Sequence, residues 1–211
     1  MSRSRLLSSL AAAALLAPAA AAQSFVNFET PHCHPLELTP DGSRLLAVNT
    51  PDDRLEVFDV SGPAVTHVGA IAVGLDPVSV RARSNGEVWV VNQISDSVSV
   101  IDLATLRVRA TLDTDDEPAD VVFAGAPQRA FVSCGNASTV LVFDPANLAA
   151  APTTVAIDAE DPRAMAGSPD GTRVYVAVFD SGNGSTVLGG GGMTGGNLSF
   201  PPNVVNDAAG P

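Results

Sequence analysis

Residues 88–108, VWVVNQISDSVSVIDLATLRV, decide the fold of this chain. They contain a short apolar strand that ends at Asn92, a tight polar turn, a second apolar strand that ends at Asp102, and a turn that contains Thr105. In the second strand apolar and polar side chains alternate with a period of two, as in Val98-Ser99-Val100, which is typical of half-buried β-strands. The stretch therefore predicts two adjacent antiparallel strands of one small sheet.

The same order of features recurs along the chain. A proline opens each of four units, at Pro35, Pro77, Pro118 and Pro162, so successive units start 42, 41 and 44 residues apart. Each unit continues with a short strand, a tight turn, a strongly apolar strand and further strands. Units of roughly 40–45 residues with four antiparallel strands are typical of β-propeller blades. The sequence therefore predicts an all-β fold, a β-propeller of four-stranded antiparallel blades, with about four blades over residues 35–188.

Three segments carry a family resemblance: residues 88–108, residues 38–60 (LTPDGSRLLAVNTPDDRLEVFDV) and residues 167–187 (GSPDGTRVYVAVFDSGNGSTV). They resemble the YVTN β-propeller repeat of exported bacterial proteins. That family usually closes its ring with seven blades, so the resemblance implies the N-terminal part of a longer propeller. We expect an incomplete ring, truncated inside a blade insertion, and the alternative is a complete four-bladed protein with a disordered end.

The two ends of the chain differ from the repeats. Residues 1–22 combine arginines, an apolar run and an Ala-x-Ala site, which predicts a signal peptide cleaved near Ala22 and Gln23. The protein should then be periplasmic or extracellular. Residues 23–34 form an entry segment that contains an expected ring-closing strand. Residues 189–211 are rich in Gly, Pro and Asn and are expected to be a flexible tail or an interrupted blade insertion, with Ser185 to Leu188 as a surviving third strand.

Charge limits the class of partner. The 211 residues carry 23 acidic and 11 basic side chains, all of the latter arginine, for a formal charge of −12. Such a balance argues against nucleic-acid binding, which needs clustered cations, and against adhesion to anionic lipid surfaces. No segment after the signal region is long and apolar enough to span a membrane. We expect a protein or small-molecule partner, and self-association through an unpaired blade is a further expectation.

Candidate chemistry is concentrated before the first blade. His32, Cys33 and His34 stand together in PHCHP, and imidazole and thiolate are good ligands for zinc or copper. We name these three residues as the metal-site hypothesis, with a polar entry segment as the alternative, and expect no other cofactor. The acidic residues between the second and third units are expected to form a solvated loop: Asp113, Asp115, Asp116 and Glu117.

Two cysteines, Cys33 and Cys134, are separated by about a hundred residues. Cys134 occupies a strand end that carries Asn49 and Asn92 in the first two units, so packing accounts for it. We expect two independent cysteines, and the sequence leaves their pairing open.

Two classes of function follow. We favour a non-catalytic exported scaffold that binds a protein, glycan or small ligand through its loops or central channel. The alternative is a metal-dependent, lactonase-like hydrolase, or an electron-transfer partner of a cytochrome domain beyond residue 211. Catalysis would need acidic or imidazole side chains to converge on the channel-facing strands, and we expect those positions to carry mostly Pro, Val, Ser and Ala. The sequence does not identify the ligand.

Overall fold

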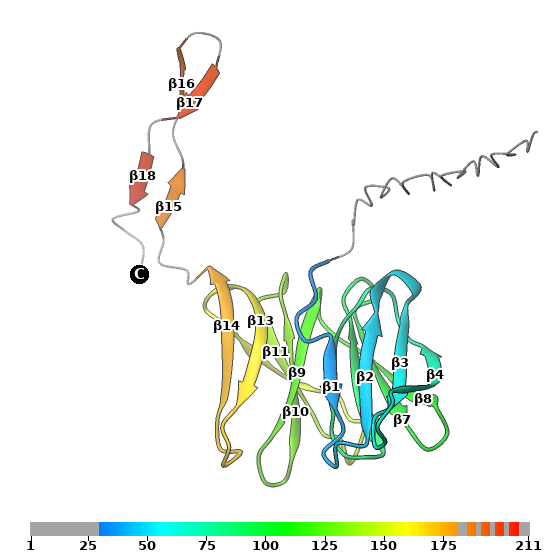
Figure 1. Cartoon of the computed structure of the whole chain (residues 1–211). Helices are drawn as coiled ribbons and strands as arrows, with labels where there is room; N and C mark the ends of the chain where they lie inside the picture. Colours follow the sequence, from blue (N-terminus) through cyan, green and yellow to red (C-terminus); the bar gives the residue numbers. More distant parts are fainter. Residues whose placement is uncertain (1–29, 181–184, 189–190, 195–196, 201–202, 207–211) are drawn as a thin grey trace, which may run out of the picture.

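The computed structural model describes residues 30–180, 185–188, 191–194, 197–200 and 203–206 (Figure 1). Apart from one 3-10 turn at Thr50–Asp52, the regular elements in these residues are β-strands. Three four-stranded antiparallel sheets follow one another along the chain, each with its strands in sequence order. The predicted signal peptide and most of the predicted ring-closing strand lie outside the described residues.

The strands of the blades have the following bounds. Blade 1 contains β1 (Leu36–Leu38), β2 (Arg44–Asn49), β3 (Arg54–Asp59) and β4 (Thr66–Ala72). Blade 2 contains β5 (Pro77–Ala82), β6 (Glu87–Asn92), β7 (Ser97–Asp102) and β8 (Arg107–Asp113). Blade 3 contains β9 (Pro118–Ala124), β10 (Arg129–Cys134), β11 (Thr139–Phe143) and β12 (Thr153–Ala156). The fourth blade contributes the pair β13 (Glu160–Gly167) and β14 (Val174–Asp180).

These sheets confirm the predicted propeller of four-stranded antiparallel blades. The described residues hold three complete blades and two strands of a fourth, so the ring is incomplete within them. No helix in this described part of the chain is long and apolar enough to cross a membrane.

The segment after β14 differs from expectation. β15 (Ser185–Leu188) is a strand, but it pairs with β18 (Asn203–Asn206) and not with β14, so its assignment as the third strand of the fourth blade is wrong. β16 (Gly191–Thr194) pairs with β17 (Asn197–Phe200). The chain therefore turns back on itself in two nested antiparallel pairs (Figure 1). The position of Ser185–Leu188 in the repeat indicates a strand, but strand type alone does not specify its partner.

Apolar side chains between neighbouring blades form the core. One cluster joins blades 1 and 2 through residues such as Leu46, Leu55 and Val90, which are fully buried. A second joins blades 2 and 3, where the indole of Trp89 packs edge-on against Phe123 and Phe143, with ring centroids 5.5 and 6.2 Å apart. Buried aromatic pairs of this kind add to the stability that area burial provides. Each blade is thus held mainly by its neighbour, as repeat architecture requires.

Two of the predicted turns share one local device. Gly42 and Gly171 adopt φ values of +68° and +67°, which glycine accepts without strain. The preceding aspartate accepts hydrogen bonds from nearby hydroxyl and amide groups, such as Thr39 Oγ1 to Asp41 Oδ1 at 2.7 Å. These bonds stabilise the charged form and lower the pKa of Asp41 and Asp170.

Candidate functional site

The first strand of each blade is the edge strand of its sheet, and these four strands are linked to one another across the blades. We define the inner-strand face by Glu37 on β1, Arg81 on β5, Asp120 on β9 and Met165 on β13. Arg81 spans this face, since its Nη2 donates to Asp120 Oδ2 at 3.1 Å and to the Met165 carbonyl at 3.4 Å. The inner strands of three blades therefore meet at one guanidinium group.

Asp120 anchors that guanidinium. Its side chain is 1% exposed and accepts from Arg81 Nε at 3.4 Å as well as from Nη2. The backbone amides of Val121 and Met165 donate to the same carboxylate at 2.8 and 2.9 Å. Because both oxygens of the Asp120 carboxylate accept hydrogen bonds, its buried charge is compensated, and Arg81 is held in one orientation.

His34 and Glu37 extend the charged group toward blade 1. His34 Nε2 lies 2.7 Å from Glu37 Oε2, and Arg81 Nη1 lies 4.0 Å from the same oxygen. The backbone amide of His34 donates to Ser79 Oγ at 2.9 Å. An imidazole, a carboxylate and a guanidinium thus lie in sequence along the inner-strand face. Together they can accept and donate protons and can bind an anion.

A cavity of about 360 Å³ adjoins the face at the end where the inner strands lead into their turns. We call it the inner-strand cavity, and side chains from blades 1 to 4 contribute to its lining, among them Glu37, Arg81, Arg83, Gln128 and Ser168. Concave sites with a few convergent polar groups are the usual places where small molecules bind.

The hydroxyl groups of the blade junctions fix the spacing of the inner strands. Thr50 Oγ1 donates to the Pro77 carbonyl at 2.7 Å, and Ser79 Oγ donates to the Ala119 carbonyl at 2.7 Å. Ser133 Oγ donates to the carbonyl of Arg163 at 2.6 Å. Each bond joins one blade to the first strand of the next, so the inner-strand face is built on a firmly connected frame.

The histidines of the metal-site hypothesis have separate partners. His32 Nε2 lies 2.5 Å from Thr50 Oγ1, whereas His34 Nε2 is bonded to Glu37. Cys33 lines a second cavity of about 330 Å³ with His32, Arg163 and Phe179. Within the described residues, no group of three or more His, Cys, Asp or Glu side chains is placed to hold a metal ion. The metal site at His32, Cys33 and His34 stays a prediction.

Both cysteines are free thiols. Burial is the main cause that raises the pKa of Cys33 to about 11, and the negative charge of Asp120 adds to the effect. Burial likewise raises the pKa of Cys134 to about 12, with Asp115 adding to it. Both thiols are therefore protonated at neutral pH, which suits packing and disfavours nucleophilic chemistry.

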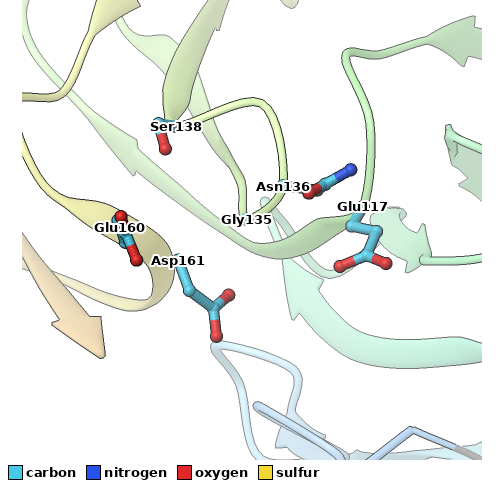
Figure 2. Close-up of a pocket in the computed structure, with 6 residues that line it drawn as sticks. All are labelled: Glu117, Gly135, Asn136, Ser138, Glu160 and Asp161. Carbon is cyan, nitrogen blue, oxygen red and sulfur yellow. The ribbon is translucent and has the colours of Figure 1, made fainter. Parts of the chain in front are cut away.

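The acidic loop between blades 2 and 3 lies beside another cavity, of about 380 Å³ (Figure 2). Its labelled lining contains the carboxylates of Glu117, Glu160 and Asp161 together with Gly135, Asn136 and Ser138. Neighbouring carboxylates are used within the loops: Thr139 Oγ1 donates to Asp115 Oδ2 at 2.8 Å, and Asn136 Nδ2 donates to Asp116 Oδ2. The loop carboxylates thus serve in part to connect the loop that follows blade 2 to blade 3.

The expectation that channel-facing positions carry mostly Pro, Val, Ser and Ala did not single out Glu37, Arg81 and Asp120, which the structure brings together on the inner-strand face. A signal was present in the repeat alignment, because the residue two positions after the opening proline is polar in the first three units: Glu37, Ser79 and Asp120. Arg81 follows at the next position on the same side of β5. Its role depends on Asp120, which lies 39 residues away in sequence.

The sheets and the inner-strand face define a β-propeller. The family described as "Lactonase, 7-bladed beta-propeller" matches residues 22–188. The match covers most of the 211 residues. This chain therefore belongs to the seven-bladed lactonase family of β-propellers.

Solved structures support the same architecture. Hydrazine synthase from Kuenenia stuttgartiensis is similar with a TM-score of 0.64 at 20% identity, covering 88% of this chain and 53% of that one. A putative 6-phosphogluconolactonase from Bacteroides uniformis has a TM-score of 0.57 at 21% identity, covering 83% of this chain and 57% of that one. A second, from Bacteroides fragilis, has a TM-score of 0.56 at 14% identity, with the same coverages.

At these identities the likeness shows the fold alone. This chain spans a little over half the length of those three structures. No curated protein sequence matches it.

Proposed function

We propose that this protein is an exported, non-catalytic β-propeller that binds a small polar ligand at the inner-strand face. One observation carries the proposal: charged side chains from three consecutive blades converge on this face, at Glu37, Arg81 and Asp120, beside a cavity that four blades line. Propellers suit this role because rigid blades present side chains to a common centre.

Preorganisation supports this proposal. The bidentate contact with Asp120 holds Arg81, so a ligand would not have to order that side chain on binding. Glu37 and Arg81 keep 28% and 23% of their side-chain surface exposed, which leaves both accessible. A purely structural ion pair would need no such access.

A matched pair of variants tests the proposal. Glu37→Gln removes the carboxylate at the inner-strand face, and Glu56→Gln does the same to a second His–Glu pair, His67 with Glu56 at 2.7 Å, on the outer strands of blade 1. Ligand-observed NMR with a panel of neutral, anionic and cationic small molecules is the assay. We expect binders to the wild type whose signals weaken with Glu37→Gln and persist with Glu56→Gln. Equal binding to both variants would contradict the proposed site.

Lactone hydrolysis is a second candidate, favoured by the family match and by the His34–Glu37 pair. Hydrolysis adds water to the lactone carbonyl and breaks the ring ester bond, giving a hydroxy acid. In this scheme His34, oriented by Glu37, takes a proton from the attacking water, and Arg81 stabilises the negative charge on the carbonyl oxygen. The proton then passes to the departing ring oxygen.

The hydrolysis of glucono-1,5-lactone, followed at constant pH, separates the two candidates. If the protein is a catalyst, the wild type hydrolyses the lactone faster than the spontaneous reaction. This excess rate should fall in the His34→Gln variant and persist in the His67→Gln variant. A wild-type rate equal to the spontaneous rate would leave the binding role as the proposal.

Export and the YVTN-type repeat belong to the same proposal. They rest on the predicted signal peptide at residues 1–22 and on the repeat segments over residues 35–188. Expression of the full chain in a Gram-negative host, followed by fractionation and mass spectrometry, tests the export. We expect a periplasmic protein that begins at Gln23, and an uncleaved cytoplasmic protein would contradict it.

A further inference from the structure

We propose that the inner-strand cavity binds the carboxylate group of a small hydroxylated anion. This inference rests on the proposed ligand-binding function and names the class of ligand. It comes from hydrogen-bonding groups of the cavity wall that have no partner among the described residues.

Arg81 offers the first unused donor group. Its Nε and Nη2 atoms donate to Asp120, at 3.4 and 3.1 Å. Its Nη1 has no hydrogen-bond acceptor among the described residues, and Glu37 Oε2 lies 4.0 Å away. The Nη1 hydrogens are therefore available to a ligand in the cavity that Arg81 lines.

Arg83 and Gln128 offer two more. Arg83 Nε donates to Gln128 Oε1 at 2.9 Å, and Nη1 donates to Glu87 Oε1 at 3.1 Å. Within the described part of the chain, neither Arg83 Nη2 nor the amide nitrogen of Gln128 has an acceptor. Since Gln128 accepts from Arg83, its amide nitrogen is directed away from that bond. Three side chains on two blades thus present free N–H groups to one cavity.

Glu37 supplies the complementary acceptor. Its Oε2 is bonded to His34, whereas no donor among the described residues reaches its Oε1. The charges on the wall are balanced, because Asp120 pairs with Arg81, and Glu87 is shared by Arg83 and Arg109 at 3.1 Å each. Recognition must therefore come from the directions of the free groups rather than from net positive charge, and we expect an affinity in the millimolar range.

This set of groups selects the class of ligand. Guanidinium and amide N–H groups match the oxygens of a carboxylate, which the planar arginine fork can bind with two hydrogen bonds. A hydroxyl group next to that carboxylate can donate to Glu37. A neutral polyol would satisfy Glu37 but would offer only neutral oxygens to the guanidinium donors, which form weaker hydrogen bonds than a carboxylate does. A simple dicarboxylate would leave Glu37 without a donor.

Tartrate, erythritol and succinate are the probes. They share a four-carbon backbone and differ in whether they carry terminal carboxylates, inner hydroxyls or both. Trp89, the one tryptophan in the sequence, reports binding because its Nε1 donates at 2.9 Å to the Glu87 oxygen that Arg83 also contacts. At constant ionic strength, we expect tartrate to change Trp89 fluorescence in a saturable way and at lower concentration than succinate or erythritol.

Calorimetric titration of tartrate into variants locates the site. Arg83→Gln and Gln128→Glu should each weaken binding by about tenfold or more, as expected when a charge-assisted hydrogen bond is lost or a like charge is introduced. Arg54→Gln removes the same charge from an exposed arginine on β3 and should leave the affinity unchanged. Gln128→Glu is isosteric, so it keeps the test valid even if Arg83→Gln fails to fold.

The outcomes distinguish an error in the class of ligand from an error in the location of the site. Equal tartrate affinity in wild type, Arg83→Gln and Gln128→Glu would overturn the inference. Erythritol binding as tightly as tartrate would overturn the carboxylate class but would leave the proposed ligand-binding function standing. If no probe binds while other molecules of the panel bind in a Glu37-dependent way, this inference fails alone. If nothing binds, the proposed function fails with it.

Discussion

Replacement of Asp120 by alanine tests how the inner-strand face is held together. The side chain is 1% exposed and accepts four hydrogen bonds, from two nitrogens of Arg81 and from the amides of Val121 and Met165. Removing one partner of a buried ion pair costs about 3–5 kcal/mol. Arg81 is 23% exposed and can recover some hydration, so we expect a loss of about 2–4 kcal/mol in the free energy of unfolding.

Thermal unfolding by circular dichroism measures this loss. For a chain of this size, 2–4 kcal/mol corresponds to a fall in Tm of roughly 5–15 °C. Asp144→Ala is the control, because its pair with Arg129 at 3.0 Å is more than 30% exposed on both sides and should contribute no more than about 1 kcal/mol. Asp120→Asn keeps the shape and should fall between the two. A Tm for Asp120→Ala within about 2 °C of the control would contradict the role of Asp120 as the anchor of Arg81.

Three further predictions follow from named groups. Because the folded state lowers the pKa of Asp41 and Asp170, their ionised carboxylates stabilise the fold above the ordinary aspartate pKa of 3.8, and this contribution is lost as the pH falls through their folded pKa values. In urea unfolding between pH 6 and pH 3, the free energy of unfolding should therefore fall less for the Asp41→Asn, Asp170→Asn double variant than for the wild type. Because its pKa is raised to about 11, Cys33 should react with iodoacetamide at pH 8 roughly a hundredfold more slowly than free cysteine, and Cys134 should react more slowly still. Mass spectrometry of the alkylated protein over time measures both rates. Phe179 is 87% exposed on β14, so if this face self-associates, Phe179→Ser should shift sedimentation of the 211-residue chain toward monomer.

The blades were predictable because their signals are local. The apolar run over residues 88–91, the alternation over residues 97–100 and turns such as Asp41-Gly42 specify strands and their nearest partners. The repeat spacing then indicates how many blades follow one another along the chain. β15 shows the limit, since the repeat pattern predicts a strand at Ser185–Leu188, while its partner, β18, lies in a segment that carries no repeat signal.

The inner-strand face was less accessible from sequence. Glu37, Arg81 and Asp120 each appear as the ordinary polar member of an alternating strand, and nothing local distinguishes them from solvent-facing residues. They become a group only when edge strands about forty residues apart are brought together by blade packing. The alignment of the units on their opening prolines contains the polar position that Glu37 shares with Asp120, but it does not show that these side chains meet. The partnership of Arg81 with Asp120 still needed the three-dimensional arrangement.

The central claim is that the inner-strand face binds a small polar ligand. A crystal structure of the protein soaked with the strongest binder from the NMR panel tests it most directly. We expect ligand density in contact with Glu37 and Arg81, within the cavity that Gln128 also lines. Density only at the loop cavity of Glu117 and Asp161, or on the outer strands, would contradict it.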